Sequence, residues 1–273
     1  MSWVLAVDFG TSNTSAAHRI GPDRVESLPL SHTSNLMPSA VYVDPAQSIT
    51  TGEVAINQAT VDPAGFVAFP KTHVAVGSVM VRGQDIPVAA TIAAVLRTVY
   101  NQALPRHNHQ PPSEVVLTHP EAWSQRELAV LREAASLAGL GGSVSLISEP
   151  RAAAFYYSRQ HDAKIVKGST IAVFDFGGGT LDIAVLTATS EWTFEVIRAG
   201  GGTTPSAART STPPSPGGST IGSAATIRSW RPGCALRTVS MLAALSTIRS
   251  AGPKSCSRSI RRRRSGSPAT ART

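Results

Sequence analysis

The 273-residue sequence predicts an α/β domain that is followed by a basic tail of different composition. Apolar strand-like runs alternate with helical patterns from residue 3 to residue 198, which is typical of α/β proteins. Residues 1–198 carry 13 Lys and Arg and 17 Asp and Glu, a net charge of −4, whereas residues 199–273 carry 12 basic residues and no acidic one, a net charge of +12. Ser, Thr, Pro and Gly make up 40 of those last 75 residues, so we expect this part to be disordered.

The elements of the α/β part follow from local patterns, taken in chain order. Short apolar runs predict strands at residues 3–9, 14–20, 39–44, 114–118, 144–148, 170–175, 182–187 and 192–197. Helical periodicity predicts a helix over residues 88–104. Ser124 and Glu127 form a capping box that predicts the start of a second helix, with Gly139 as its stop signal. Pro150 at a first helical position predicts a third helix over residues 150–160.

Several classes of protein are excluded by composition. The apolar run from Ile86 to Leu96 is too short to span a membrane. The N-terminus has no basic region and reaches Asp8 at once, so a signal peptide is not expected. Both cysteines, Cys234 and Cys256, lie in the tail, which leaves no disulfide framework or four-ligand zinc site in the α/β part. We therefore expect a cytoplasmic protein.

The strongest motif occurs twice. Residues 5–11 read LAVDFGT and residues 172–180 read AVFDFGGGT, so each copy is an apolar strand that ends in Asp, Phe, a glycine turn and Thr. Glycines allow backbone N–H groups to converge on an anion, and the Thr hydroxyl adds a donor. A carboxylate repels phosphate but suits a hydrated Mg²⁺ that the phosphates also bind. One copy could be only a tight hairpin; two matched copies favour a clamp around a triphosphate and its Mg²⁺.

Three segments resemble ATP-site motifs of the 70-kDa heat-shock chaperone (DnaK-like) family. They are AVDFGTSNT, LISEPRAAAFYY and IAVFDFGGGTLDIAVL, and the resemblance covers residues 3–198. It implies an actin-like ATPase (ribonuclease H-like) fold, with lobe I at residues 1–168, the first strands of lobe II at 169–199 and a low-complexity tail at 200–273. The E-P-x-A-A-A helix start favours chaperones over the sugar kinases and actin-like filament proteins that share this fold.

The resemblance also implies roles for particular residues in hydrolysis of ATP. Asp8 and Asp175 would hold Mg²⁺ through water. Lys71 would position the attacking water, Glu149 would be the catalytic glutamate, and Asp182 together with Asp175 would help to orient the water. The phosphates would be lined by Gly10, Thr11, Ser12, Asn13, Gly177, Gly178, Gly179 and Thr180. Partners by resemblance are ATP or ADP and co-chaperones, with no membrane.

Each of these residues also has a simpler interpretation. Lys71 alone would be a solvated surface lysine, and Glu149 alone would be an acid favoured by the dipole at a helix N-terminus. Trp123 and Trp192 are most simply packing residues, and His107 lies in a polar loop that suggests solvent more than a metal. Arg151 stands where the family usually has a small polar residue, and Thr72 follows Lys71 where a basic residue is common. We expect these two departures to affect the rate more than binding.

The resemblance ends at the glycines of residues 200–202. The adenine pocket, the exchange-factor lobe, the interdomain linker and the peptide-binding domain have no counterpart in the sequence that follows, so we expect weak Mg-ATP binding and very slow hydrolysis. Two explanations of the tail compete. Out-of-frame translation of a GC-rich gene, which we favour, accounts for the loss of every acidic residue. The alternative is a non-enzymatic binding protein whose basic tail, with Arg261–Arg264, contacts nucleic acid or an acidic partner.

Overall fold

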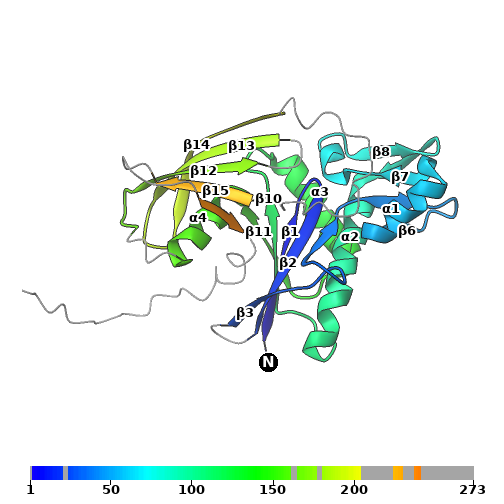
Figure 1. The fold of residues 1–273 in the computed structure, drawn as a ribbon, viewed down its shortest axis with the longest axis horizontal. Coiled ribbons are helices and arrows are strands. Elements are labelled where there is room, and N and C mark those ends of the chain that lie inside the picture. The colour runs from blue at the N-terminus through cyan, green and yellow to red at the C-terminus, as the bar shows by residue number, and fades with distance from the viewer. Residues whose placement is uncertain are drawn as a thin grey trace, which may run out of the picture.

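The computed structural model describes residues 2–20, 24–160, 165–176, 180–203, 224–229 and 237–240. Two β-sheets dominate this part of the chain, and a small mixed region projects from one side (Figure 1). The prediction of a mixed α/β protein is therefore confirmed. The arginine run Arg261–Arg264 lies outside the described residues. None of the described helices is long and apolar enough to cross a membrane.

The first sheet has the order β11-β10-β1-β2-β3, and β4 also pairs with β2. Strands β1, β10 and β11 run parallel to one another, whereas β2 runs antiparallel to β1. Alternation along β1 gives this sheet two buried faces. Leu5 and Val7 belong to the main core, whereas Val4 and Ala6 belong to a small core on the opposite face. The strands are β1 (Trp3–Phe9), β2 (Asn13–Ile20), β3 (Arg24–Ser27), β4 (Leu36–Pro38), β10 (Glu114–His119) and β11 (Ser143–Ser148).

Helices α2 (Val88–Ala103) and α3 (Gln125–Leu137) close the main core. The apolar stripe of α2 is buried at Ile92, Val95, Leu96 and Val99, as its periodicity predicts. The expected capping box is present at the start of α3: Arg126 N donates to Ser124 Oγ, and Ser124 N donates to Glu127 Oε2.

A smaller region follows the first hairpin in the chain (Figure 1). It contains a three-stranded sheet, a two-stranded sheet and helix α1. Most of it was not expected from the sequence, because its strands are only two to four residues long. Its elements are β5 (Val41–Val43), β6 (Ile49–Thr51), α1 (Gly52–Val61), η1 (Pro63–Gly65), β7 (Phe66–Val67), η2 (Pro70–His73), β8 (Ser78–Val81) and β9 (Gln84–Pro87), with η3 (Leu104–His107) after α2.

The second sheet is antiparallel throughout, in the order β14-β13-β12-β15-β16. Strand β14 runs on to Thr203, beyond the expected end at residue 197. Strands β15 and β16 come from the segment that we expected to be low-complexity tail. The strands are β12 (Thr170–Phe176), β13 (Thr180–Ala188), β14 (Phe194–Thr203), β15 (Ala224–Ser229) and β16 (Arg237–Ser240).

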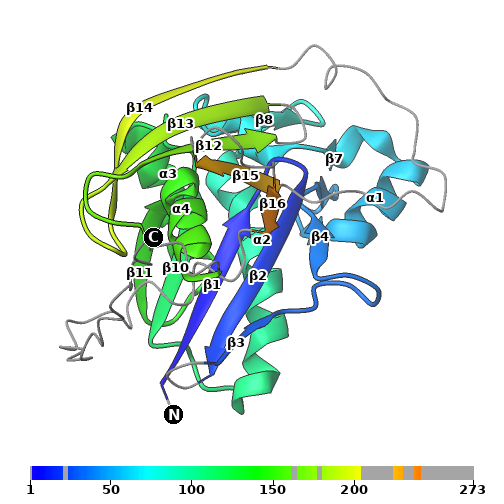
Figure 2. The same cartoon turned by 60° about the vertical axis from the view of Figure 1, so that its left-hand side comes forward.

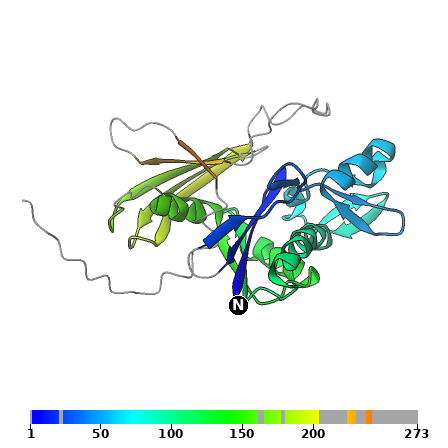
Figure 3. The same cartoon turned by 60° about the horizontal axis from the view of Figure 1, so that its bottom comes forward.

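Helix α4 (Glu149–Gln160) lies between the two sheets (Figures 2 and 3). Ala152 packs with Val4 and Ala6 of the first sheet, whereas Ala153 and Ala154 belong to the core of the second sheet. Small side chains on both sides allow two sheets to approach one helix closely. The alanine run therefore fixes α4, and with it Glu149 at its N-terminus, at the junction of the sheets.

Candidate functional site

The first hairpin places Asp8 at the end of β1, where it is buried. Thr118 Oγ1 donates a hydrogen bond of 2.7 Å to Asp8 Oδ1. Thr118 stands near the end of β10, the parallel neighbour of β1, so both residues reach the same edge of the sheet. Sequence reasoning missed Thr118, although the expected strand at 114–118 ends on it.

Ser39 stabilises the turn that follows Asp8 through two hydrogen bonds to its backbone. Gly10 N donates to Asn13 O at 3.1 Å, which closes the turn. Ser39 Oγ donates to Gly10 O at 2.8 Å, and Ser39 N donates to Ser12 O at 2.9 Å. Thr11, Ser12 and Asn13 are only partly buried, so the turn presents polar groups at its rim.

The second hairpin carries two carboxylates side by side. Asp175 on β12 faces Asp182 on β13 in the strand register. Asp175 Oδ1 is buried and has no hydrogen-bond partner within the described residues. Thr180 begins β13, whereas Gly177, Gly178 and Gly179 lie outside the described residues. The predicted phosphate contacts of this loop therefore stay a prediction.

A buried ion pair lies between the two hairpins. Lys71 Nζ and Glu149 Oε1 are 2.7 Å apart, and their side chains are only 8% and 11% exposed. Lys71 comes from the short turn η2, and Glu149 is the first residue of α4. The Lys71 ammonium also lies 5.7 Å from the centroid of the Trp123 ring. The interpretation of Lys71 as a solvated surface lysine is therefore wrong.

The titration of these groups shows how they act on one another. Burial raises the pKa of Asp175 to about 7, and repulsion from Glu149 and Asp8 adds to this. Burial and repulsion from Glu149 also raise the pKa of Asp8, although Lys71 and the Thr118 hydroxyl oppose the shift. Burial would lower the pKa of Lys71, but attraction to Glu149 and Asp8 raises it. The site has an excess of carboxylates over cations, so it favours a further positive charge.

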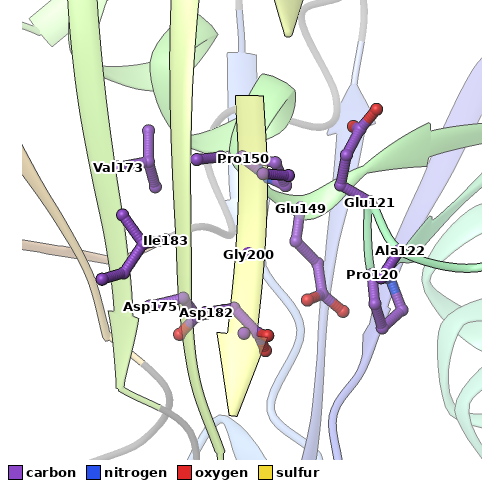
Figure 4. Close-up of a pocket in the computed structure, with 13 residues that line it drawn as sticks. Pro120, Glu121, Ala122, Glu149, Pro150, Val173, Asp175, Asp182, Ile183 and Gly200 are labelled. Atoms are coloured by element: carbon purple, nitrogen blue, oxygen red, sulfur yellow. The ribbon is translucent and has the colours of Figure 1, made fainter. Parts of the chain in front are cut away.

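A cavity of about 290 Å³ opens beside these groups, between the two sheets. The carboxylates of Glu149, Asp175 and Asp182 lie toward one end of it, whereas Val173 and Ile183 contribute apolar wall (Figure 4). Gly201 of β14 stands opposite Asp182, and a Cβ added there would lie 1.9 Å from Asp182 Oδ1. The lining residues are Pro120, Glu121, Ala122, Glu149, Pro150, Val173, Asp175, Asp182, Ile183, Ala184, Ala199, Gly200 and Gly201.

The chain is similar to known chaperones. The family model described as Hsp70 protein matches residues 71–205, a range that includes Lys71, Glu149, Asp175 and Asp182. The chaperone protein DnaK of Elusimicrobium minutum is 33% identical over 208 residues, which are 74% of this chain and 33% of that protein. The chain belongs to the Hsp70 family. The DnaK of Endomicrobium trichonymphae is 29% identical over 208 residues, 74% of this chain and 32% of that protein.

A third relative of this Hsp70-family chain is a homologue of the chaperone protein HscA from Azotobacter vinelandii. It is 30% identical over 223 residues, which are 72% of this chain and 34% of that protein. The chain thus spans about a third of the length of the curated relatives that it matches. The family resemblance that the motifs predict is confirmed.

The two departures from the family pattern have clear surroundings in this Hsp70-family chain. Arg151 points to Glu121 at the rim of the cavity, with Nη2 3.8 Å from Glu121 Oε1 and a side chain that is 45% exposed. Thr72 donates its hydroxyl to Phe69 O at 2.7 Å and so closes its own turn. Arg151 is two positions after Glu149 on α4, and residues so spaced do not share a helix face.

Proposed function

We propose that this Hsp70-family chain binds Mg-ATP between its two sheets and hydrolyses it. We further propose that the sheets are the two lobes of an actin-like (ribonuclease H-like) ATPase fold, the second of them incomplete. One observation carries the proposal: the buried Lys71–Glu149 pair lies close enough to Asp8 on the first hairpin and to Asp175 on the second that Lys71 interacts electrostatically with both carboxylates. These four residues are far apart in the chain, and their convergence at one place supports a common functional site.

The residues present suit a magnesium ion. Mg²⁺ prefers hard oxygen ligands and is usually held by one or two carboxylates with water and phosphate oxygens. Asp8 and Asp175 would hold the ion. Asp175 Oδ1 is buried and has no hydrogen-bond partner within the described residues, so this oxygen is available to a water ligand of Mg²⁺. No group of three or more His, Cys, Asp or Glu in that part of the chain could hold a metal ion directly. When bound, Mg²⁺ would neutralise charge on the phosphate oxygens.

The chain's own groups would position the reactants. Lys71 stays protonated at neutral pH because carboxylates raise its pKa, so its ammonium can donate to an attacking water and to phosphate. Glu149 accepts from Lys71 through Oε1 and would accept a proton from that water. Asp182, in the cavity wall, would help to orient the same water. The turn at residues 10–13 offers backbone N–H groups and hydroxyls to the phosphates.

The biological role that we propose is that of a chaperone's nucleotide-binding domain. The relatives are named DnaK and HscA chaperones, and this chain matches a third of their length. In such a protein, ATP binding would govern protein folding together with co-chaperones. This role rests on the relatives' names and on the site, whereas the ATPase reaction rests on the site's geometry.

ATP turnover by the purified protein tests the reaction. Lys71→Ala removes the only cation of the central pair, so we expect turnover to fall by about 100-fold, as for loss of a preorganised electrostatic contact. Asp8→Ala should weaken Mg²⁺-dependent ATP binding, measured by calorimetry. Lys167→Ala and Asp85→Ala, which change exposed residues, are the matched controls. Turnover by Lys71→Ala at the wild-type rate would exclude the proposed mechanism.

A further inference from the structure

The position of the Lys71 ammonium is set by two side chains. On one side it donates to Glu149 Oε1 at 2.7 Å, and on the other it lies 5.7 Å from the centre of the Trp123 indole. Lys71 stands on a four-residue 3₁₀ turn, and its four-carbon side chain has many rotamers. Glu149 alone can accept from an ammonium at several angles. The aromatic face of Trp123 is therefore a second constraint on the Lys71 ammonium, and it selects one direction of the Lys71 side chain.

Trp123 is itself held firmly by the backbone around it. Trp123 N donates to Pro120 O at 3.2 Å in the turn that follows β10, and Ser124, the next residue, begins the capping box of α3. Trp123 packs as a partly buried residue against the main core. Pro120, Glu121 and Ala122 of the same turn line the cavity, so the turn that holds Trp123 is adjacent to it.

A purely structural role has to be weighed against a role in the site. Trp123 precedes the N-cap Ser124, and Leu128 is the fourth residue of the helix. This is the spacing of a hydrophobic staple, which any large apolar residue could form. The staple does not explain why the ring faces an ammonium. A cation within about 6 Å of an aromatic face is attracted by the ring's quadrupole, and the attraction grows when both groups are desolvated.

We propose that Trp123 is a positioning residue, whose indole face holds the Lys71 ammonium against Glu149, which lines the cavity. The inference deepens the proposed function, on which its consequence for ATP hydrolysis rests. Without the ring, Lys71 has one fixed contact and samples other directions, so the attacking water is less often in place. The aromatic ring also makes Trp123 a fluorescent reporter of the Lys71 charge.

The first test needs no nucleotide. Tryptophan emission of the full chain is compared between wild type and Lys71→Met, and again between Trp123→Phe and the double variant Trp123→Phe/Lys71→Met. Loss of an adjacent charge should change the emission in the first pair and leave it unchanged in the second. An equal change in both pairs would mean that the Lys71 charge acts on another tryptophan, and it would overturn the proposal whether or not the chain hydrolyses ATP.

The second test separates positioning from the staple. Trp123→Leu keeps an apolar staple and removes the aromatic face, whereas Trp123→Phe keeps both. We expect kcat of Trp123→Leu to fall by about tenfold with KM for ATP little changed, and Trp123→Phe to restore most of it. Trp192→Leu is the matched control, because Trp192 also faces a cation, Arg159 at 5.2 Å, but that cation is not part of the Lys71–Glu149 pair.

Two outcomes of the second test would count against the proposal. Equal kcat for Trp123→Leu and Trp123→Phe, with equal melting temperatures, would leave Trp123 as a staple only. An equal loss of kcat in Trp192→Leu would show that the effect is general to the fold. Absence of turnover in the wild type would reject the proposed function instead, and the nucleotide-free emission comparison would then decide whether Trp123 holds Lys71.

Discussion

Single carboxylates determine the character of this site. Burial pushes both Asp8 and Asp175 toward the protonated form, and repulsion from Glu149 raises the pKa of each further. A carboxyl group with a pKa of about 7 is costly to the folded protein when it must ionise without a cation nearby. Carboxyl groups whose pKa is raised by burial and by neighbouring carboxylates cluster at catalytic and ligand-binding sites.

The raised pKa of Asp175 predicts how stability depends on pH. Between about pH 4 and pH 7 the folded chain keeps a proton that the unfolded chain has released, so stability falls as the pH rises through this window. Asp175→Asn removes the effect. As the pH rises from 4.5 to 8, we expect the free energy of unfolding of the variant to increase relative to that of the wild type. The increase should be at most about 4 kcal/mol, at about 1.4 kcal/mol per pKa unit.

Urea denaturation at pH 4.5, 6 and 8 without Mg²⁺ would measure this difference. Asp85→Asn is the control, because Asp85 is exposed on β9. Parallel pH profiles for wild type and Asp175→Asn would show that Asp175 ionises normally in the folded chain.

The sequence predicted the site residues that belong to recognisable motifs, and it did not predict the site residues that lie outside such motifs. Asp8, Glu149 and Asp175 follow from repeated or family-like segments, and in the structure all three interact electrostatically with Lys71. Thr118 and Trp123 carry no motif, because their contacts depend on strand order and on one aromatic ring. His107, expected in a solvated loop, instead stacks on Trp3 at 3.7 Å between ring centroids.

Elements determine how accurately these residues are placed. Helix α4 is wedged between the sheets by alanines, and its first residue, Glu149, is therefore fixed relative to both. The sequence predicted this helix from Pro150, but its position between the sheets could not be predicted from local periodicity. Strand β14 was expected to end at residue 197, but it continues to Thr203. Gly201, which has no side chain, leaves room there for the Asp182 side chain.

This close approach makes Gly201→Ala a sharp test of β14. The added Cβ would lie 1.9 Å from Asp182 Oδ1, so the carboxylate has to leave its place in the cavity wall. We expect ATP turnover to fall by about tenfold or more, as for other small displacements of catalytic groups, with little change in melting temperature.

Gly200→Ala is the matched control for this variant, because nothing lies within 4 Å of a Cβ at that position. It should lose much less turnover than Gly201→Ala. If the two substitutions had equal effects, the loss of turnover would come from any added side chain on β14 and not from contact with Asp182.

At the scale of the whole molecule, the described part of the chain is dominated by two large sheets with separate cores, which meet at α4 and at the cavity. The main core belongs to the first sheet with α2 and α3, and a smaller core joins the second sheet to α4. The change in composition after residue 198 predicted where the α/β pattern stops, yet the second sheet includes β15 and β16 from beyond that point. Sequence composition cannot reveal such pairing, because it depends on a partner strand far away in the chain.

A ligand held by both sheets should stabilise them together. Mg-ATP that contacts Asp8 on the first sheet and Asp175 on the second binds only while both are folded, so it should raise the melting temperature of the whole chain. At 100 times the dissociation constant the gain is about 2.7 kcal/mol. At about 2–4 °C per kcal/mol for a domain of this size, the melting temperature should rise by several degrees.

Differential scanning fluorimetry with ATP, with and without excess EDTA, measures the effect. Chelation should abolish the rise if Mg²⁺ links the phosphates to the carboxylates, and Asp8→Ala and Asp175→Ala should each reduce it, although they lie on different sheets. Asp85→Ala should show the full rise. A ligand that contacts both hairpins should stabilise the chain less when either aspartate is removed. A rise in melting temperature that survives EDTA and both aspartate substitutions would therefore mean that ATP binds elsewhere on the molecule.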